Sequence, residues 1–228
     1  MLKLNQLVLH MSTAFLGGPR RIKLAWVVNA QKGGTLIVYL AMVWAYEASG
    51  PAVWVLVALH GSYGLIWLMK EAAFPDVSWQ RRVTFGAAVV SFLAVLGPYW
   101  LIGWVLISGQ TEGLQSMAAL GFAIGLYALG VALMIGADAQ KFYTLKLRKG
   151  LIEDGMFARI RHPNYLGEMM IYGSFALVVW HWLPVVILGV IWGTLFAGNI
   201  AAKEASLSRH PGWAAYKART GSVLPKLW

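Results

Sequence analysis

Residues 159–170, RIRHPNYLGEMM, place charged and polar side chains at the start of an apolar stretch. Pro163 suits the first turn of a helix, where its missing N–H costs nothing. Such a helix start offers free backbone N–H groups and a positive dipole end to an anion, and Arg161 adds two parallel donors. Asn164 and Glu168 are four residues apart, so they share one helical face. The segment predicts an anion site at the membrane surface that continues into a polar notch.

Other ionisable side chains within or beside apolar stretches are few, and such residues are functional candidates in a membrane protein. They are Glu47, His60 and Asp138. Tyr63 lies three residues after His60 and therefore on the same helical face. Each has a structural alternative: Glu47 and Asp138 can face water at the end of a span, and His60 can be a hydrogen-bonded packing residue.

Several classes of site are excluded by composition. The chain has no cysteine, which removes disulfides, zinc–thiolate sites and cysteine nucleophiles. It has no G-x-G-x-x-G, Walker A or H-E-x-x-H motif, so neither a soluble nucleotide-binding fold nor a metal site is predicted. A nucleotide cofactor would need a cavity built between helices and basic loops.

The elements that must position these residues are apolar helices. Hydrophobic residues make up 59% of the 228 residues, far above their share in a soluble domain. This predicts an all-α integral membrane protein with about six transmembrane helices. A kink is expected at Gly97-Pro98. The predicted spans are 33–46, with an extension back towards Leu24 as an alternative, 51–69, 83–107, 116–137, 165–182 and 184–202.

Basic residues predict the orientation of these spans. All 19 lysines and arginines fall within 3–32, 70–82, 141–161 and 203–226, and the alternate connections carry none. By the positive-inside rule, both termini are cytoplasmic. The net charge of +10 is therefore attributed to loops beside anionic membrane lipid, and no nucleic-acid partner is expected.

Two terminal segments flank the transmembrane domain, which is predicted over 24–202. Residues 1–23 are expected to form an interfacial helix ended by Gly17-Gly18-Pro19. Residues 203–228 form a basic, aromatic cytoplasmic tail. The tail either anchors in the interface or closes over a ligand in a cytoplasmic cavity.

Three motifs resemble those of a known group of membrane reductases. DAQK at 138–141, RHPNYLGE at 161–168 and HPGWAAYKARTGSVLP at 210–225 resemble the steroid 5-alpha-reductase and sterol reductase superfamily, in particular its bacterial members of unknown function. The isoprenylcysteine carboxyl methyltransferases share this architecture but use S-adenosylmethionine. Asn164, Glu168 and Asp138 favour the reductases, and one glutamate, in Lys203-Glu204, stands where the methyltransferases carry two.

The resemblance implies an NADPH-dependent reductase of a C=C bond in a lipophilic enone. It implies that Tyr63 and Glu47 hold the substrate carbonyl and assist its protonation. The alternatives are an S-adenosylmethionine-dependent methyltransferase and a non-catalytic lipid-binding protein. The expected location is the bacterial inner membrane, or the endoplasmic reticulum in a eukaryote; the oligomeric state stays open. The residues implied in cofactor binding are Asp138, Lys141, Arg148, Arg161, His162, Asn164, Tyr165, Glu168 and Tyr216.

Overall fold

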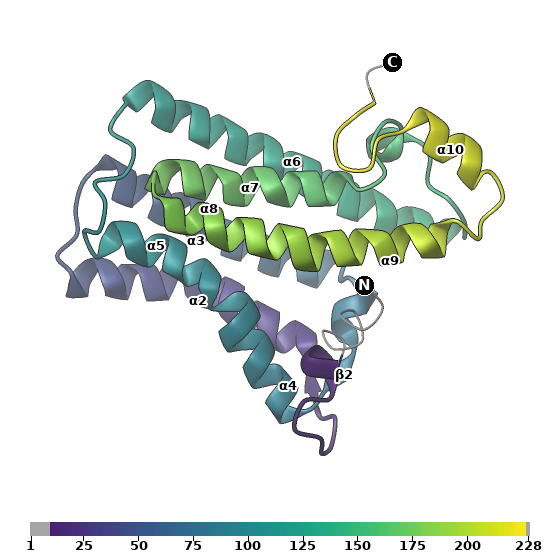
Figure 1. Cartoon of the computed structure of the whole chain (residues 1–228), viewed down its shortest axis with the longest axis horizontal. Coiled ribbons are helices and arrows are strands. Elements are labelled where there is room, and N and C mark those ends of the chain that lie inside the picture. The colour runs from purple at the N-terminus through teal and green to yellow at the C-terminus, as the bar shows by residue number, and fades with distance from the viewer. Residues whose placement is uncertain (1–9, 227–228) are drawn as a thin grey trace. The chain divides into compact units, whose positions relative to one another are not determined.

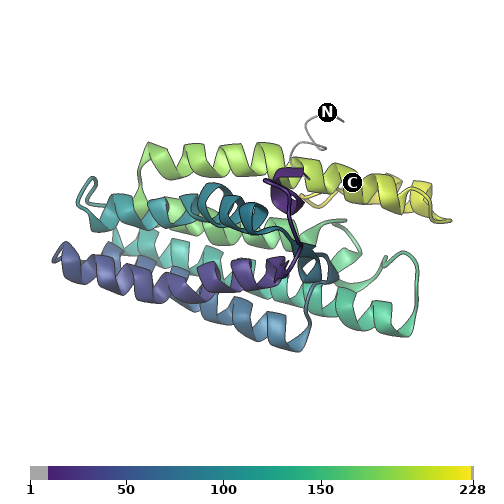
Figure 2. The same cartoon turned by 90° about the horizontal axis from the view of Figure 1, so that it is seen from below.

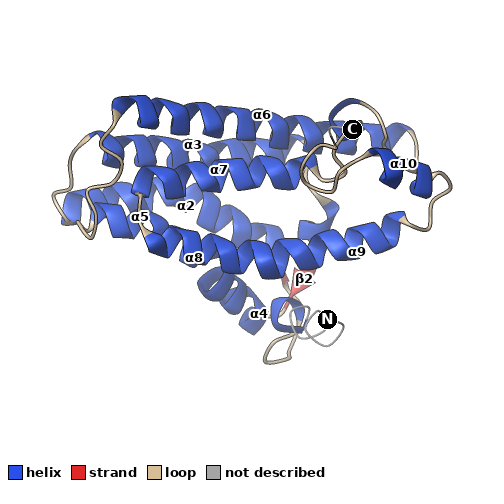
Figure 3. Cartoon of the chain, turned by 45° about the horizontal axis from the view of Figure 1, so that its top comes forward, coloured by secondary structure: helices blue, strands red, loops and turns tan. Residues whose placement is uncertain are grey.

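The computed structural model describes residues 10–226, so part of the predicted interfacial segment, 1–9, and the last two tail residues lie outside the described residues. The described chain is mostly helical, with two short strands (Figure 3). Its described residues form two compact units, one within 10–121 and 175–187, the other within 122–174 and 188–226.

The first unit is built on a helical hairpin of α2 and α3, which lie side by side (Figures 1 and 2). Their backbones approach so closely at Gly64 that a Cβ atom there would lie 2.0 Å from the carbonyl oxygen of Lys32. The elements of this unit are β1 (Ile22–Lys23), α2 (Leu24–Ala45), α3 (Pro51–Ala73), η1 (Val77–Gln80), β2 (Arg82–Val83), α4 (Phe85–Val90), η2 (Ser91–Leu96) and α5 (Pro98–Ile107). Short strands β1 and β2 pair antiparallel before α2 and α4.

The third predicted span is broken where the sequence indicates. Its helix changes from α4 to the π-helical segment η2, and α5 then begins at Pro98. The N–H of Gly97 donates to the carbonyl of Phe92, five residues back, at 2.7 Å. Proline has no N–H to continue an α-helical ladder, and Figure 1 shows the chain bending between α4 and α5. The predicted kink is confirmed.

The second unit contains most of α6 and α7 and the helical C-terminal part of the chain. Glycines set the packing of α6 on α7, because a Cβ at Gly167 would lie 2.6 Å from the carbonyl oxygen of Gly130. Such small residues allow close backbone approach between membrane helices. The elements are α6 (Met117–Leu147), η3 (Gly155–Phe157), α7 (Pro163–Val179), α8 (Trp182–Ile191), η4 (Trp192–Phe196, π-helical), α9 (Ala197–Leu207) and α10 (Trp213–Arg219). The connected tip of the α7–α8 hairpin, residues 175–187, belongs to the first unit.

Helices occupy all six ranges predicted as spans, and four are long and apolar enough to cross a membrane. These are Pro51–Ala73, Phe85–Ile107, Met117–Leu147 and Trp182–Leu207. The chain is therefore consistent with an integral membrane protein. α7 has only 17 residues, and α2 carries Asn29, Gln31 and Lys32 in its first half. Six spans and cytoplasmic termini stay predictions.

Candidate functional site

A buried lysine lies among aromatic rings in the first unit. Lys32 is 5% exposed. Its Nζ atom lies 4.3 Å from the ring centroid of Tyr63, 5.1 Å from that of Trp67 and 5.6 Å from that of Tyr99. A cation over aromatic faces is attracted by their quadrupoles, most strongly where water is excluded. Lys32 and Tyr63 therefore form an enclosed pair of a cation and a phenol.

A hydrogen-bonded group adjoins this pair. The hydroxyl of Tyr39 lies 2.9 Å from Nδ1 of His60 and accepts a hydrogen bond from the N–H of Gly103 at 3.1 Å. The His60 ring stacks on Phe175, with centroids 4.4 Å apart. His60 thus packs and bonds within the core, as its structural alternative predicts. We call Lys32, Tyr39, His60, Tyr63 and Tyr99 the polar core.

The structure does not bring Glu47 to Tyr63. Glu47 is exposed in the turn after α2, whereas Tyr63 is fully buried and lies about 18 Å of helix beyond the start of α3. Glu47 adopts a left-handed φ of 50°. Its N–H donates to Trp44 and the N–H of Ala48 donates to Val43, which is a Schellman cap of α2. The predicted catalytic role of Glu47 therefore has no geometric support.

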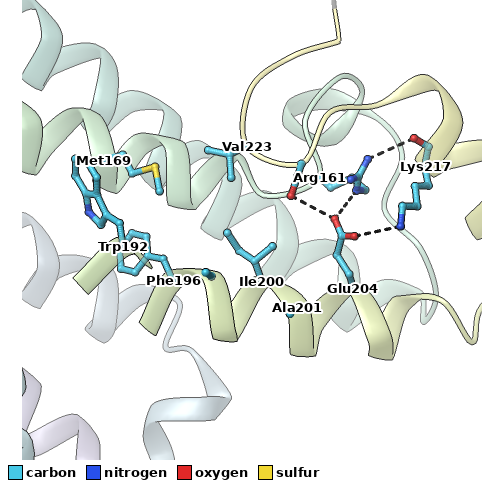
Figure 4. Close-up of a pocket in the computed structure, with 11 residues that line it drawn as sticks. Arg161, Met169, Trp192, Phe196, Ile200, Ala201, Glu204, Lys217 and Val223 are labelled. Carbon is cyan, nitrogen blue, oxygen red and sulfur yellow. Dashed lines mark hydrogen bonds and ion pairs between the residues drawn. The ribbon is translucent and has the colours of Figure 1, made fainter. Parts of the chain in front are cut away.

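Arg161 holds the C-terminal tail in the second unit (Figure 4). Its Nε donates to Oε1 of Glu204 at 2.8 Å, and its Nη1 donates to the carbonyl and hydroxyl oxygens of Thr220. The Glu204 carboxylate also lies 3.6 Å from Nζ of Lys217 and accepts from the hydroxyl of Ser222. Arg161 is 8% exposed, so these contacts occupy the guanidinium that was expected to bind a phosphate.

The rest of the tail packs against residues 153–162. The Tyr216 hydroxyl donates to the carbonyl of Phe157 at 2.9 Å, and burial raises the pKa of Tyr216 to about 12. Arg219 pairs with Glu153. The backbone of Gly221 bridges to Ile160 in parallel. The tail therefore docks on residues 153–162, and both of its predicted roles stay predictions.

His162 and Tyr165 lie beside this junction. His162 is 3% exposed, and its backbone N–H donates to the carbonyl of Ser222 at 3.0 Å. Burial, reinforced by the charges of Lys203 and Arg161, lowers the pKa of His162 to about 4 despite Glu204 nearby. The ring of Tyr165 meets Phe196 edge-on at 4.8 Å. Both side chains therefore fill the junction between α7 and α9.

The remaining predicted cofactor residues lie on α6, on α7 and in the loop between them. α6 and α7 run antiparallel, with Gly130 and Met134 against Gly167. Continuing this register by one turn places Asp138 level with Asn164. Asp138, Lys141, Asn164 and Glu168 are all partly exposed. Arg148 is exposed and pairs with Asp154 at 3.3 Å.

Sequence reasoning misses two residues at these sites. In the sequence, Lys32 is one of the basic residues that precede the span predicted to begin at 33. In the structure, α2 begins at Leu24 and Lys32 lies inside the helix. Glu204 enters the sequence argument only through the comparison with the methyltransferases. Both could have been suspected, because a charge inside an apolar helix requires a partner.

The apolar helices are consistent with an integral membrane protein, and they enclose a set of polar side chains. A family model described as "Protein of unknown function (DUF1295)" matches residues 23–220, and the chain belongs to that family. The family is part of the steroid 5-alpha-reductase-like superfamily. A curated relative, an uncharacterized protein of Schizosaccharomyces pombe (strain 972), is 28% identical over 133 residues, which are 50% of this chain. They cover 47% of that protein, about half its length.

Proposed function

We propose that the protein is an NADPH-dependent reductase of the C=C bond of a lipophilic enone. The observation that carries the proposal is the Lys32–Tyr63 pair, buried in the helices of a chain whose family belongs to a reductase-like superfamily. A phenol in a dry, apolar pocket can donate a hydrogen bond to the carbonyl oxygen of a conjugated substrate. That bond strengthens as negative charge develops on the oxygen during reduction.

Lys32 takes the role that the sequence suggested for Glu47. Its ammonium lies over the Tyr63 ring and withdraws electron density from it. A phenol polarised in this way is a stronger hydrogen-bond donor. Removing one preorganised donor of an oxyanion typically costs about 10²–10³ in kcat, which is the contribution we assign to the Tyr63 hydroxyl.

Side chains on the α6–α7 face and in the loop after α6 support the choice of NADPH. A carboxylate at Asp138 and an amide at Asn164 suit ribose hydroxyls and the nicotinamide carboxamide, while Lys141 and Arg148 suit phosphates. These groups are partly or fully exposed, as a site open to a cytoplasmic cofactor requires. When bound, NADPH supplies the hydride.

Cofactor binding tests this proposal against its alternatives. Purified protein in lipid nanodiscs is heated with NADPH or with S-adenosylmethionine. NADPH at about 100 times its Kd should stabilise the protein by about 2.7 kcal/mol, and S-adenosylmethionine should not. Asn164→Ala should weaken the NADPH effect, with Asn199→Ala, an exposed asparagine on α9, as the control. Stabilisation by S-adenosylmethionine alone supports the methyltransferase, and no response to either supports the lipid-binding protein.

Turnover is the second test. Loss of NADPH absorbance is followed with a series of lipophilic enones and their saturated analogues. Tyr63→Phe should lower kcat while leaving the affinity for NADPH unchanged, because the hydroxyl acts on the substrate. Wild-type turnover in Tyr63→Phe would remove Tyr63 as the donor.

A further inference from the structure

A pocket in the second unit is lined by none of the predicted cofactor residues except Arg161. Its volume is about 610 Å³, within the range of small-molecule sites. It lies between α7, the helix formed by η4 and α9, and the C-terminal tail (Figure 4). Glu204 and Lys217 line one end, so the tail contacts described above also form a wall of the pocket.

The other end of the pocket is apolar. Met169, Trp192, Phe196 and Ile200 line it, with Val223 of the tail above them. From Trp192 to Glu204 the helix rises about 18 Å. This pocket therefore changes from apolar to charged along a length that fits a hydrocarbon chain with a polar head. A nucleotide, with charged or polar groups along most of its length, would leave this wall without matching contacts.

The side chains that line the charged end carry one excess positive charge. Arg161 and Lys217 are cations and Glu204 is a carboxylate, and the three are joined by contacts of 2.8 and 3.6 Å. The neighbouring His162 is neutral at pH 7, because its pKa is about 4. The side chain of Lys217 is 56% exposed and can turn towards a ligand. A singly negative head group would balance this end.

The helix that forms the floor is long and apolar enough to cross a membrane and is largely exposed. It belongs to the candidate span Trp182–Leu207, of which only 17% of the most apolar stretch is buried. Ala197 and Ala201, one turn apart, contribute small side chains to the pocket lining. An amphiphile can therefore enter from the lipid and lie along the helix.

We propose that this pocket binds a membrane amphiphile with an acyl or prenyl chain and a singly negative head group. The chain lies along Trp192, Phe196 and Ile200, and the head lies beside Lys217. This site stands apart from the reductase proposal, since neither the polar core nor NADPH takes part in it.

The test measures binding of cis-parinaric acid, a fluorescent 18-carbon fatty acid, to the full chain in phosphatidylcholine nanodiscs, with empty nanodiscs subtracted. Ala201→Trp fills the pocket from its lining and should weaken binding at least tenfold. Ala214→Trp, on the exposed side of α10, is the matched control and should bind as wild type. If Ala201→Trp lowers the melting temperature, Val223→Trp replaces it. Unchanged binding in a folded pocket-filling variant overturns the proposal.

The head group is tested separately. Lys217→Ala should weaken binding of the acid about two- to fivefold, as expected for an exposed ion pair, and should leave binding of its methyl ester unchanged. Lys149→Ala, in the loop after α6, is the control. Inorganic phosphate should not displace the acid. Displacement by phosphate together with no binding of the ester would show a site for free anions and overturn the proposal.

Discussion

The ammonium of Lys32 lies 4.3 Å from the ring centroid of Tyr63, and both side chains are buried between α2 and α3. Gly64 makes this approach possible, because any side chain there would collide with the Lys32 backbone. Placing a cation in an apolar helix is costly, and the aromatic rings offset only part of that cost. We infer that the pair serves the proposed reaction, which substitutions of Lys32 test.

Lys32→Met should reduce turnover and not cofactor affinity. A cation–π contact is worth about 0.5–2 kcal/mol, so kcat should fall about 2- to 30-fold. Lys32→Arg should retain much of the wild-type rate, because a guanidinium also stacks on aromatic faces. Equal rates for wild type and Lys32→Met would show that the lysine has only a packing role.

Glu47→Gly should stabilise the protein without lowering its activity. Glycine adopts the left-handed conformation at this cap without steric cost, so the gain is about 0.5–1 kcal/mol. Chemical denaturation and enone turnover are measured together. A loss of turnover in both Glu47→Gly and Glu47→Gln would instead restore the catalytic role suggested by the resemblance.

Arg161→Met should release the C-terminal tail. It removes the bonds to Thr220 and leaves Glu204 without its closest cation, and breaking a largely buried pair costs about 3–5 kcal/mol. Limited proteolysis within residues 208–226 should become faster. Arg209→Met, which alters an exposed arginine bonded to Ser206, is the control. Cleavage at the wild-type rate would mean that other contacts hold the tail.

Acid should destabilise the protein through His162. Its folded pKa of about 4 lies below the ordinary value of 6.5. The contribution of neutral His162 to the free energy of unfolding is therefore fully present above pH 6.5. It is lost as the pH falls towards 4, by about 3 kcal/mol in all. His162→Gln should flatten the decline in melting temperature over this range. His210→Gln, an exposed histidine before α10, should leave the decline unchanged.

Much of the helical layout could be predicted because apolar run length and proline chemistry act locally. Gly97-Pro98 indicated the break, and helices fill the six predicted ranges. Helix ends were less predictable: α2 starts at Leu24, directly after Ile22 and Lys23, which pair with the distant strand β2. That early start places Lys32 inside α2, so its partners could not be recognised from the sequence alone.

The candidate site was predictable in its residue types more than in its contacts. Arg161 and Tyr216 stood out for their chemistry. In the structure, hydrogen bonds of both side chains hold the tail in place, since a buried guanidinium takes the acceptors nearest to it. Glu204 lies 43 positions after Arg161 in the chain, and no local pattern links two such residues. Helical spacing did predict that Asn164 and Glu168 share a face.

The π-helical segment η2 fixes the length of the third apolar helix as well as its shape. A π turn holds about one residue more than an α turn, so deleting one residue from 91–96 would leave a regular α turn and keep the residues after it facing the same way. Tyr99 and Gly103, which meet the Tyr39 hydroxyl, would stay in place, whereas one deletion within regular α-helix would rotate them away by about 100°. In related chains, a one-residue gap at this point is therefore compatible with the same interior, and a gap elsewhere in the helix is not.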